Sequence, residues 1–176
     1  VAPMQGEGPF CFDAATTSIT FNAVKAAVAA GKSLPPGLVA DAAGNETTDP
    51  RKAEQLLPIG GYKGFGLSMV VDILCAVLSG MPNGNHVSQM FSPTFEQKRH
   101  LGQMYCALRI DAFRDVELFK VELKDMADRV RNEPAIDPGI RQIMVPGDPE
   151  KVEWVKRTSR GIPMFEHDLK SLAKSL

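Results

Sequence analysis

The protein has 176 residues, 44% of them hydrophobic, and carries 20 basic side chains against 21 acidic ones. A chain of this size and composition can bury a core of its own, which argues against disorder and indicates one globular domain. The formal charge of −1 argues against nucleic acid or an anionic membrane as a partner, because both are bound by clustered Lys and Arg.

The most apolar run of the chain, from Phe65 to Leu78, contains Ser68 and Asp72 and is shorter than the ~20 residues of a membrane-spanning helix. The polar stretch at 5–8 does not resemble a secretory signal. We therefore expect a cytoplasmic protein.

The three cysteines are odd in number and far apart, and they form neither a zinc pattern nor a disulfide framework. We expect reduced core thiols and no metal site. The cysteines are Cys11, Cys75 and Cys106.

The chain begins with a short buried strand expected at 10–12, followed by a helix at 19–30. Thr17 or Ser18 would cap this helix, and Gly31 would follow its last turn. The region after Gly31 is rich in Pro, Gly, Asn and Asp, which indicates turns. Only a short strand, at 38–40, is expected within it.

A glycine-rich segment from Gly60 to Gly66 precedes the next predicted helix, which runs to about Ser79 and stops at Gly80. The polar residues of this helix fall on one narrow stripe of an otherwise apolar cylinder. A helix that is apolar on nearly all sides is expected to be buried centrally.

The second half of the chain reads as strand, helix, strand, helix. Asp115 would cap the first of these helices, and Asp148 with Pro149 would start the second. The expected elements are a strand at 104–110, a helix at 116–131, a strand at 140–145, a helix ending near 160, and a final amphipathic segment at 165–176.

The Gly60–Gly66 segment is the strongest candidate binding site. Closely spaced glycines let the backbone approach a ligand, and the amides of the following helix would point toward it. Lys63 beside the positive end of a helix is unfavourable unless an anion lies near it. The alternative is that the glycines permit close helix packing and Lys63 points into water.

Two other turns between a strand and a helix have a similar character, Asp13 to Ser18 and Val145 to Pro149. The hydroxyls of the first suit a phosphate or a ribose. For each turn taken alone, ordinary helix capping is the better explanation of the residues.

The three histidines, His86, His100 and His167, occupy settings typical of surface residues. The sequence contains no nucleophile elbow and no HExxH zinc motif. No catalytic group is therefore predicted within this chain.

Several segments occur together in an order that resembles the malate/L-lactate dehydrogenase family, and within it the ureidoglycolate dehydrogenases. The resemblance covers nearly the whole chain. Its segments are Phe12-Asp13-Ala14-Ala15-Thr16-Thr17, Leu34-Pro35, Thr47-Thr48-Asp49-Pro50, Leu57-Pro58, Gly60-Gly61-Tyr62-Lys63-Gly64-Phe65-Gly66-Leu67, Leu78-Ser79-Gly80-Met81-Pro82, Val87-Ser88-Gln89-Met90, Leu101-Gly102-Gln103 and Val145-Pro146-Gly147.

The resemblance implies an α/β fold with a mixed, non-Rossmann sheet and packed helices, in homodimers of chains about twice this length. Residues 1–148 would be the C-terminal part of the NAD(P)-binding domain, and 149–176 would be helices packing toward a domain outside this chain. The implied cofactor-binding residues, for NAD or NADP, are Phe12, Asp13, Ala14, Ala15, Thr16, Thr17, Ser18, Tyr62, Lys63, Gly147, Asp148 and Pro149.

The resemblance also implies that the acid-base histidine lies in a Ser-His-Gly motif, which this sequence lacks. We therefore expect the cofactor-binding half of an NAD(P)-dependent 2-hydroxyacid dehydrogenase, inactive by itself, in an enzyme acting on malate, lactate, ureidoglycolate or a similar acid.

One departure from the family is at 21–25, where many relatives carry glycine before lysine. The alternatives are a nucleotide- or phosphate-binding module without catalysis and a dimerisation fragment.

Overall fold

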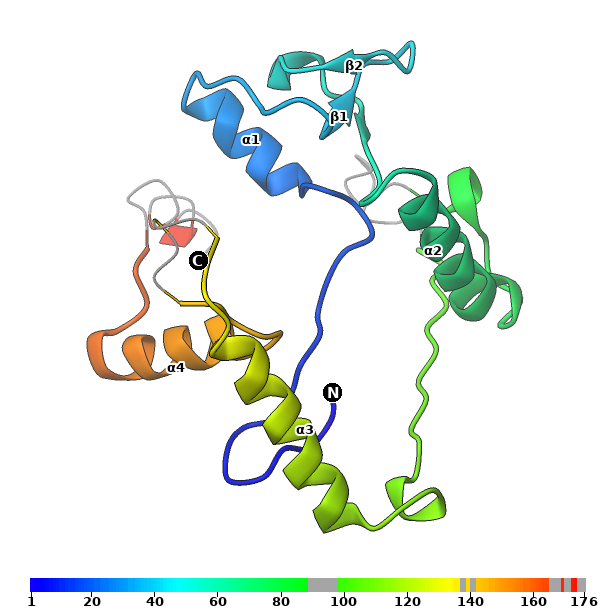
Figure 1. Cartoon of the computed structure of the whole chain (residues 1–176). Coiled ribbons are helices and arrows are strands. Elements are labelled where there is room, and N and C mark those ends of the chain that lie inside the picture. The colour runs from blue at the N-terminus through cyan, green and yellow to red at the C-terminus, as the bar shows by residue number, and fades with distance from the viewer. Residues whose placement is uncertain (89–97, 137–138, 140–141, 165–168, 170–171, 174–176) are drawn as a thin grey trace. The chain divides into compact units, whose positions relative to one another are not determined.

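The computed structural model describes residues 1–88, 98–136, 139, 142–164, 169, 172 and 173 (Figure 1). The chain divides into two compact units. The terminal unit consists of Val1–Asp13 and Leu108–Leu176, and the central unit of Ala14–Ala107. The domain division at residue 148 concerns the domains of longer relatives, and it stays a prediction.

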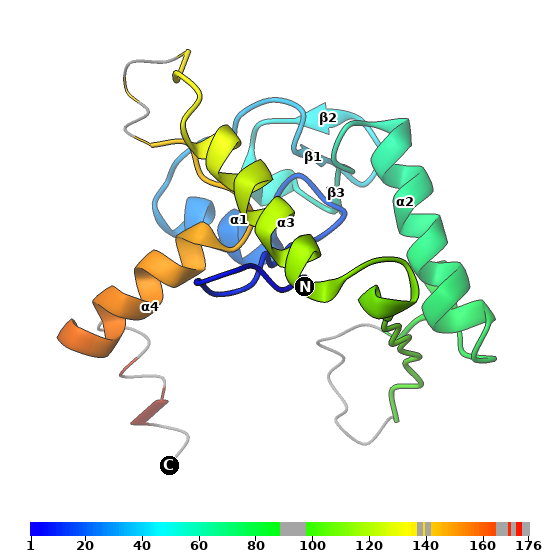
Figure 2. The same ribbon diagram turned by 60° about the horizontal axis from the view of Figure 1, so that its bottom comes forward.

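The central unit begins with helix α1 (Phe21–Ala29) and a small antiparallel sheet of strand order β2-β1-β3. The strands are β1 (Val39–Ala40), β2 (Glu46–Thr47) and β3 (Gln55–Leu56), with a 3-10 turn, η1 (Pro50–Lys52), before β3. The predicted strand at 38–40 is thus confirmed. α1 packs on this sheet through a core of Val24, Leu34 and Val39 (Figures 1 and 2).

Helix α1 starts two residues later than expected. Its N-cap is Thr20, whose hydroxyl accepts a hydrogen bond from the Ala23 amide at 3.2 Å. The predicted caps are wrong because Thr17 and Ser18 are used elsewhere: the Thr17 hydroxyl donates to the Ile19 carbonyl, and the Ser18 amide donates to Leu57. Gly31 follows the helix with a φ of 63°, as predicted.

Helix α2 (Tyr62–Asp72) continues into a π-helical turn, η2 (Ile73–Val77), and Gly80 follows with a φ of 71°. The end of the predicted helix is therefore confirmed. Its start lies earlier than predicted, so that two of the glycines are inside the helix. A short 3-10 turn, η3 (Gly84–His86), follows this helix.

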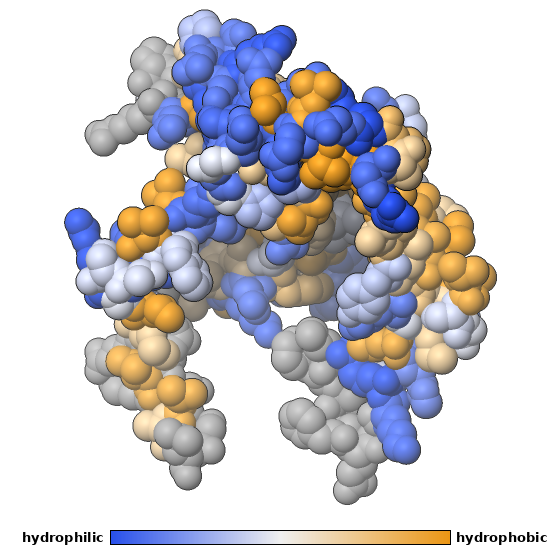
Figure 3. All heavy atoms as spheres, turned by 90° about the horizontal axis from the view of Figure 1, so that it is seen from below, coloured by the Kyte–Doolittle hydropathy of each residue, from blue (hydrophilic) through white to orange (hydrophobic). Residues whose placement is uncertain are grey.

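The expectation that this helix is centrally buried is wrong for the described chain. Phe65 is 59% exposed, Ile73 51% and Leu78 72%. Figure 3 shows hydrophobic surface along the right-hand edge of the view, the side on which Figure 1 places α2. The helix has the composition of a buried element, but the described residues do not cover it.

The terminal unit contains η4 (Ile110–Ala112), α3 (Val116–Arg131) and α4 (Asp148–Arg160). The predicted α3 is confirmed together with its cap, because the Asp115 carboxylate accepts from the Leu118 amide at 2.8 Å. α4 ends as predicted, but its N-cap is Gly147 and not Asp148.

The core of the terminal unit joins the start of the chain to α3 and to the segment before α4. Met4, Ala127 and Val145 are buried together, and Phe10 and Leu123 pack against them. Phe10 pairs with Ala2 in an isolated antiparallel bridge. The expected buried strand at 10–12 is otherwise wrong, since Phe12 is 64% exposed.

The strand expected at 104–110 is also wrong. Residues 104–109 form no ladder with any described residue, and Tyr105 and Leu108 are 86% and 79% exposed. An alternating pattern forms a strand only where a neighbour accepts its backbone hydrogen bonds. The predicted strand at 140–145 lies partly outside the described residues, as does the segment at 165–176, and residues 142–145 are not paired as a strand.

None of the helices in the described residues has the length and apolar character needed to cross a membrane.

Two glycines of α2 offer a matched test of how closely this helix approaches the residues before it. A Cβ at Gly64 would overlap the carbonyl oxygen of Ile59, whereas a Cβ at Gly66 would enter open space. Gly64→Ala should lower the free energy of unfolding by about 1–3 kcal/mol. Gly66→Ala should raise it by about 0.5–1 kcal/mol, because alanine is the better helix former. Urea unfolding followed by circular dichroism measures both, and equal effects of the two substitutions would contradict the close approach at Gly64.

Candidate functional site

The first of the three candidate segments in chain order is residues 12–18, and backbone contacts are made at both of its ends. Just before it, the Cys11 amide donates to the Pro146 carbonyl at 3.2 Å, within the terminal unit. At its other end, Thr17 forms an antiparallel bridge with Pro58, within the central unit. Residues 12–15, between these anchors, are exposed.

Two backbone hydrogen bonds bring the first candidate turn beside the second. The Ser18 amide donates to the Leu57 carbonyl at 2.9 Å, and the Ile59 amide donates to the Thr16 carbonyl at 3.0 Å. Residues 57–59 lead directly into the glycines before α2. The hydroxyl-rich stretch Thr16–Ser18 therefore runs alongside the segment that carries Tyr62 and Lys63.

The start of α2 is a positively polarised position. Gly60 and Gly61 have φ angles of 61° and 63°, which glycine adopts without strain, and they turn the chain into the helix. No side chain caps the helix, and its first turn contains no acidic residue. Tyr62 is 82% exposed, and Lys63 is exposed beside it. Helix-end amides and a cation form a donor set that fits an anionic ligand such as a diphosphate, and an accessible aromatic ring lies next to the cation in the sequence.

The third candidate turn places Gly147 against the start of the chain. Its φ is 98°, and a Cβ there would lie 3.1 Å from the Cys11 nitrogen and 3.4 Å from the Pro9 carbonyl oxygen. The Asp148 amide donates to Val145, and the Lys151 amide to Gly147. Only glycine suits both this conformation and this close approach.

The Asp148 carboxylate is already bound by its surroundings. Arg131 donates to it through two nitrogens at 2.8 and 2.6 Å, and the Val145 amide donates to it at 3.1 Å. The Arg131 hydrogen bond lowers the pKa of Asp148 to about 2, against the opposing effect of burial, and the Val145 amide lowers it further. The same guanidinium lowers the pKa of Glu7. At this turn the backbone of Asp148 and the exposed Pro149 are left to meet a ligand.

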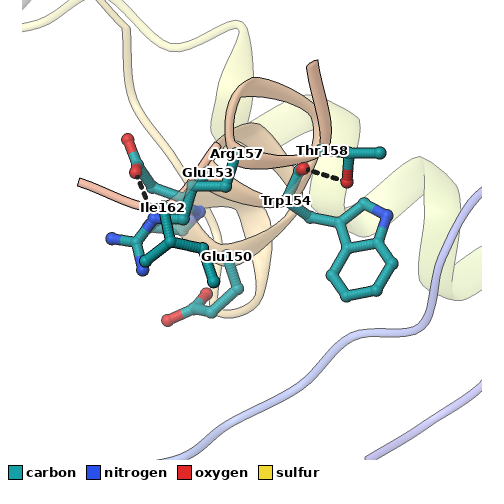
Figure 4. Close-up of a pocket in the computed structure, with 7 residues that line it drawn as sticks. Glu150, Glu153, Trp154, Arg157, Thr158 and Ile162 are labelled. Carbon is teal, nitrogen blue, oxygen red and sulfur yellow. Dashed lines mark hydrogen bonds and ion pairs between the residues drawn. The ribbon is translucent and has the colours of Figure 1, made fainter. Parts of the chain in front are cut away.

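A hollow of about 630 Å³ lies along α4, next to this turn (Figure 4). Within it Arg157 donates to Glu153 at 2.9 Å, and the Thr158 hydroxyl donates to the Trp154 carbonyl at 2.7 Å. Glu150 and Glu153 supply negative charge, so the hollow is a poor place for a phosphate. The lining residues are Pro149, Glu150, Glu153, Trp154, Arg157, Thr158 and Ile162.

The remaining candidate groups add no chemistry in the described part of the chain. No group of three or more His, Cys, Asp or Glu side chains there is arranged to hold a metal. His86 and His100 are exposed, as predicted, and His167 lies outside the described residues. Cys11 and Cys75 are half-buried, but Cys106 is exposed, so the prediction of a core thiol is wrong for Cys106.

Two residues that shape the third turn had no sequence signal of a site, Arg131 and Glu7. Arg131 follows Asp128 at a spacing that indicates an ordinary ion pair on a helix surface. Glu7 is 124 residues away from it along the chain. Neither is recognisable without the fold.

The family model of malate/L-lactate dehydrogenase matches residues 1–173. The chain belongs to this family. It is 34% identical over 165 residues to the ureidoglycolate dehydrogenase (NAD(+)) of Escherichia coli strain K12, covering 94% of this chain and 47% of that protein. It is 33% identical over 151 residues to the L-sulfolactate dehydrogenase of Methanocaldococcus jannaschii, covering 84% and 42%.

Solved structures of this family have the same fold. The sulfolactate dehydrogenase of M. jannaschii matches with a TM-score of 0.80 at 28% identity, over 93% of this chain and 46% of that one. The malate dehydrogenase of Entamoeba histolytica matches with a TM-score of 0.85 at 25% identity, over 98% and 51%. The α/β fold class is confirmed. This chain spans about half the length of the curated relatives it matches.

The ion pair at Asp148 predicts an acid-sensitive contribution to stability. The folded-state pKa of Asp148, about 2, lies below its usual value of 3.8. This contribution is therefore fully present above about pH 4 and is lost as the pH falls through about 2. The free energy of unfolding, measured in urea across this range, should fall more steeply for the unaltered protein than for Asp148→Asn. Parallel curves would show that Asp148 does not titrate as described.

Proposed function

We propose that this chain is the cofactor-binding part of an NAD-type dehydrogenase that interconverts a small 2-hydroxy acid and the corresponding 2-oxo acid. The observation that carries the proposal is the backbone pairing of Thr16–Ser18 with Leu57–Ile59. It holds a hydroxyl-bearing stretch beside the positively polarised start of α2. Two comparisons support the proposal: the chain belongs to the malate/L-lactate dehydrogenase family, and one relative is a ureidoglycolate dehydrogenase (NAD(+)).

The start of α2 and Lys63 would bind the diphosphate of the cofactor, because this helix end carries no acid of its own. Exposed residues of the first turn, Phe12 to Ala15, would contact the nucleotide through their backbone, and Thr16 would add a hydroxyl. Gly147 to Pro149 would contribute backbone surface, since the carboxylate between them is bound to Arg131. Thr17, Ser18 and Tyr62 complete the proposed set.

The bound nicotinamide supplies a hydride acceptor and donor at its C4 atom. The residues of this chain bind and orient the cofactor. We propose that the proton of the substrate hydroxyl is exchanged by a histidine outside this chain, because the resemblance implies an acid-base histidine in a Ser-His-Gly motif that this sequence lacks. The whole protein is proposed to be a cytoplasmic homodimer.

The exposed surface of the chain supports a role together with further polypeptide. Apolar side chains of α2 are exposed in the described residues, among them Phe65 at 59%, Ile73 at 51% and Leu78 at 72%. A contiguous exposed apolar face of this kind is typical of a surface that packs against further polypeptide.

Binding of NADH tests the proposal directly. Titration of the full chain should give saturable nicotinamide fluorescence, and Lys63→Ala should weaken binding about tenfold, as expected for loss of one charge-assisted contact of about 1.4 kcal/mol. Lys32→Ala, at an exposed lysine beyond α1, is the control and should bind as the unaltered chain does. A parallel titration with NADPH compares the two cofactors. No binding of either would overturn the proposal and favour a dimerisation fragment.

Turnover separates the dehydrogenase from a binding module without catalysis. With NAD and either malate or ureidoglycolate, the isolated chain should give no NADH, because the acid-base histidine is not on it. Activity should appear when the remaining polypeptide of the longer protein is present. Turnover by the isolated chain would place a catalytic group here, and binding without turnover in the longer protein would favour the binding module.

A further inference from the structure

The ends of α3 and α4 and the start of the chain meet at one arginine, within the terminal unit. Arg131 is the last residue of α3, Asp148 is the first residue of α4, and Glu7 lies in the segment before Phe10. The three side chains are 16%, 13% and 23% exposed. Three segments that are distant in sequence are thus joined through one guanidinium.

Every N–H of the Arg131 guanidinium has an acceptor. An arginine side chain has five such donors. Nε donates to Asp148 at 2.8 Å, Nη1 to Glu7 at 2.9 Å and to Asp128 at 2.8 Å, and Nη2 to Asp148 at 2.6 Å and Glu7 at 3.1 Å. This arrangement specifies arginine, since a lysine ammonium has three donors and no planar fork.

Two lysines complete the cluster. Lys151 lies 3.2 Å from Glu7 and 3.5 Å from Asp148, and Lys124 lies 2.6 Å from Asp128 and 3.7 Å from Glu7. Three carboxylates are thereby balanced by three cations. Loss of Arg131 leaves Glu7 and Asp148 as neighbouring negative charges with one lysine between them, which favours their separation.

This cluster contacts both of the backbone segments that approach each other at Gly147, the turn before α4 and the start of the chain. On one side, the Asp148 carboxylate that Arg131 holds also accepts from the Val145 amide, which closes the turn containing Gly147. On the other side, Glu7 fixes the chain segment that leads to Cys11, whose amide donates to Pro146. The guanidinium therefore sets the position of the turn relative to the backbone against which Gly147 packs.

We propose that Arg131 is a positioning residue for the cofactor-binding turn at Gly147–Pro149, acting through Asp148 and Glu7 without touching the cofactor. This inference rests on the proposed function, because it assigns a role to a turn of that site. It predicts that Arg131 controls cofactor affinity through local order of the turn, beyond any contribution to overall stability.

The test compares Arg131→Met and Arg131→Lys with Arg129→Met in the full chain. Arg129 lies on the same helix and pairs only with Asp125 among the described contacts, at an exposed position, so it is a matched loss of one arginine. Arg131→Met should raise the Kd for NADH about tenfold, Arg131→Lys should raise it less, and Arg129→Met should leave it unchanged. Should Arg131→Met fail to fold, the lysine variant carries the comparison.

Hydrogen exchange of the backbone amides of Val145, Gly147, Asp148, Glu150 and Lys151 is measured on the same variants. Exchange should be about tenfold faster in Arg131→Met, while amides of the central unit, such as that of Leu34, keep their rates. Lower thermal stability with an unchanged Kd would overturn the positioning role. If the unaltered chain binds no NADH, the proposed function fails, and the exchange rates then decide separately whether Arg131 holds the turn. Unchanged exchange in both Arg131 variants would overturn the inference in either case.

Discussion

Close approach of one backbone to another is the constraint on which the starts of α2 and α4 depend, each within its own unit. At Gly64 the first turn of α2 lies against the Ile59 carbonyl, and at Gly147 the start of α4 lies against Pro9 and Cys11. A side chain at either position would force the segments apart. Because the contacts are between main chains, the helix starts are held in place while neighbouring residues, such as Tyr62 and Pro149, stay exposed.

The starts of α2 and α4 differ in their electrostatics. α4 begins with two acidic residues, one of which is bound to Arg131, so its positive end is compensated within the protein. α2 begins without any acid and carries Lys63. An anionic group gains more at the second position. This difference is the reason for proposing the start of α2, rather than the turn before α4, as the position of the cofactor diphosphate.

The sequence was sufficient where structure depends on local rules. Helix α3 was predicted with its Asp115 cap because its apolar period and its capping residue lie within one short stretch. The strand expected at 104–110 failed because a strand depends on a partner that alternation does not reveal. The burial of α2 failed for a related reason, since its composition reflects surroundings that the described residues do not supply.

The candidate site was predictable as separate turns but not as an arrangement. Gly60–Gly66 and Thr16–Ser18 were recognisable from residue types, yet their pairing uses backbone atoms, which carry no sequence signature. The cluster around Arg131 joins residues 124 positions apart, and each of its members resembles an ordinary surface charge when read alone.

The π-helical turn at Ile73–Val77 has a consequence for the loop that returns past it. The wider turn lets the Leu78 amide donate to Ile73, five residues back, while the Ser79 hydroxyl donates to the Cys75 carbonyl at 2.6 Å. A Cβ at position 102 would overlap that same carbonyl. Cys75 lies within the π-helical turn, so a carbonyl of this turn makes glycine obligatory at a point 27 residues further along the chain.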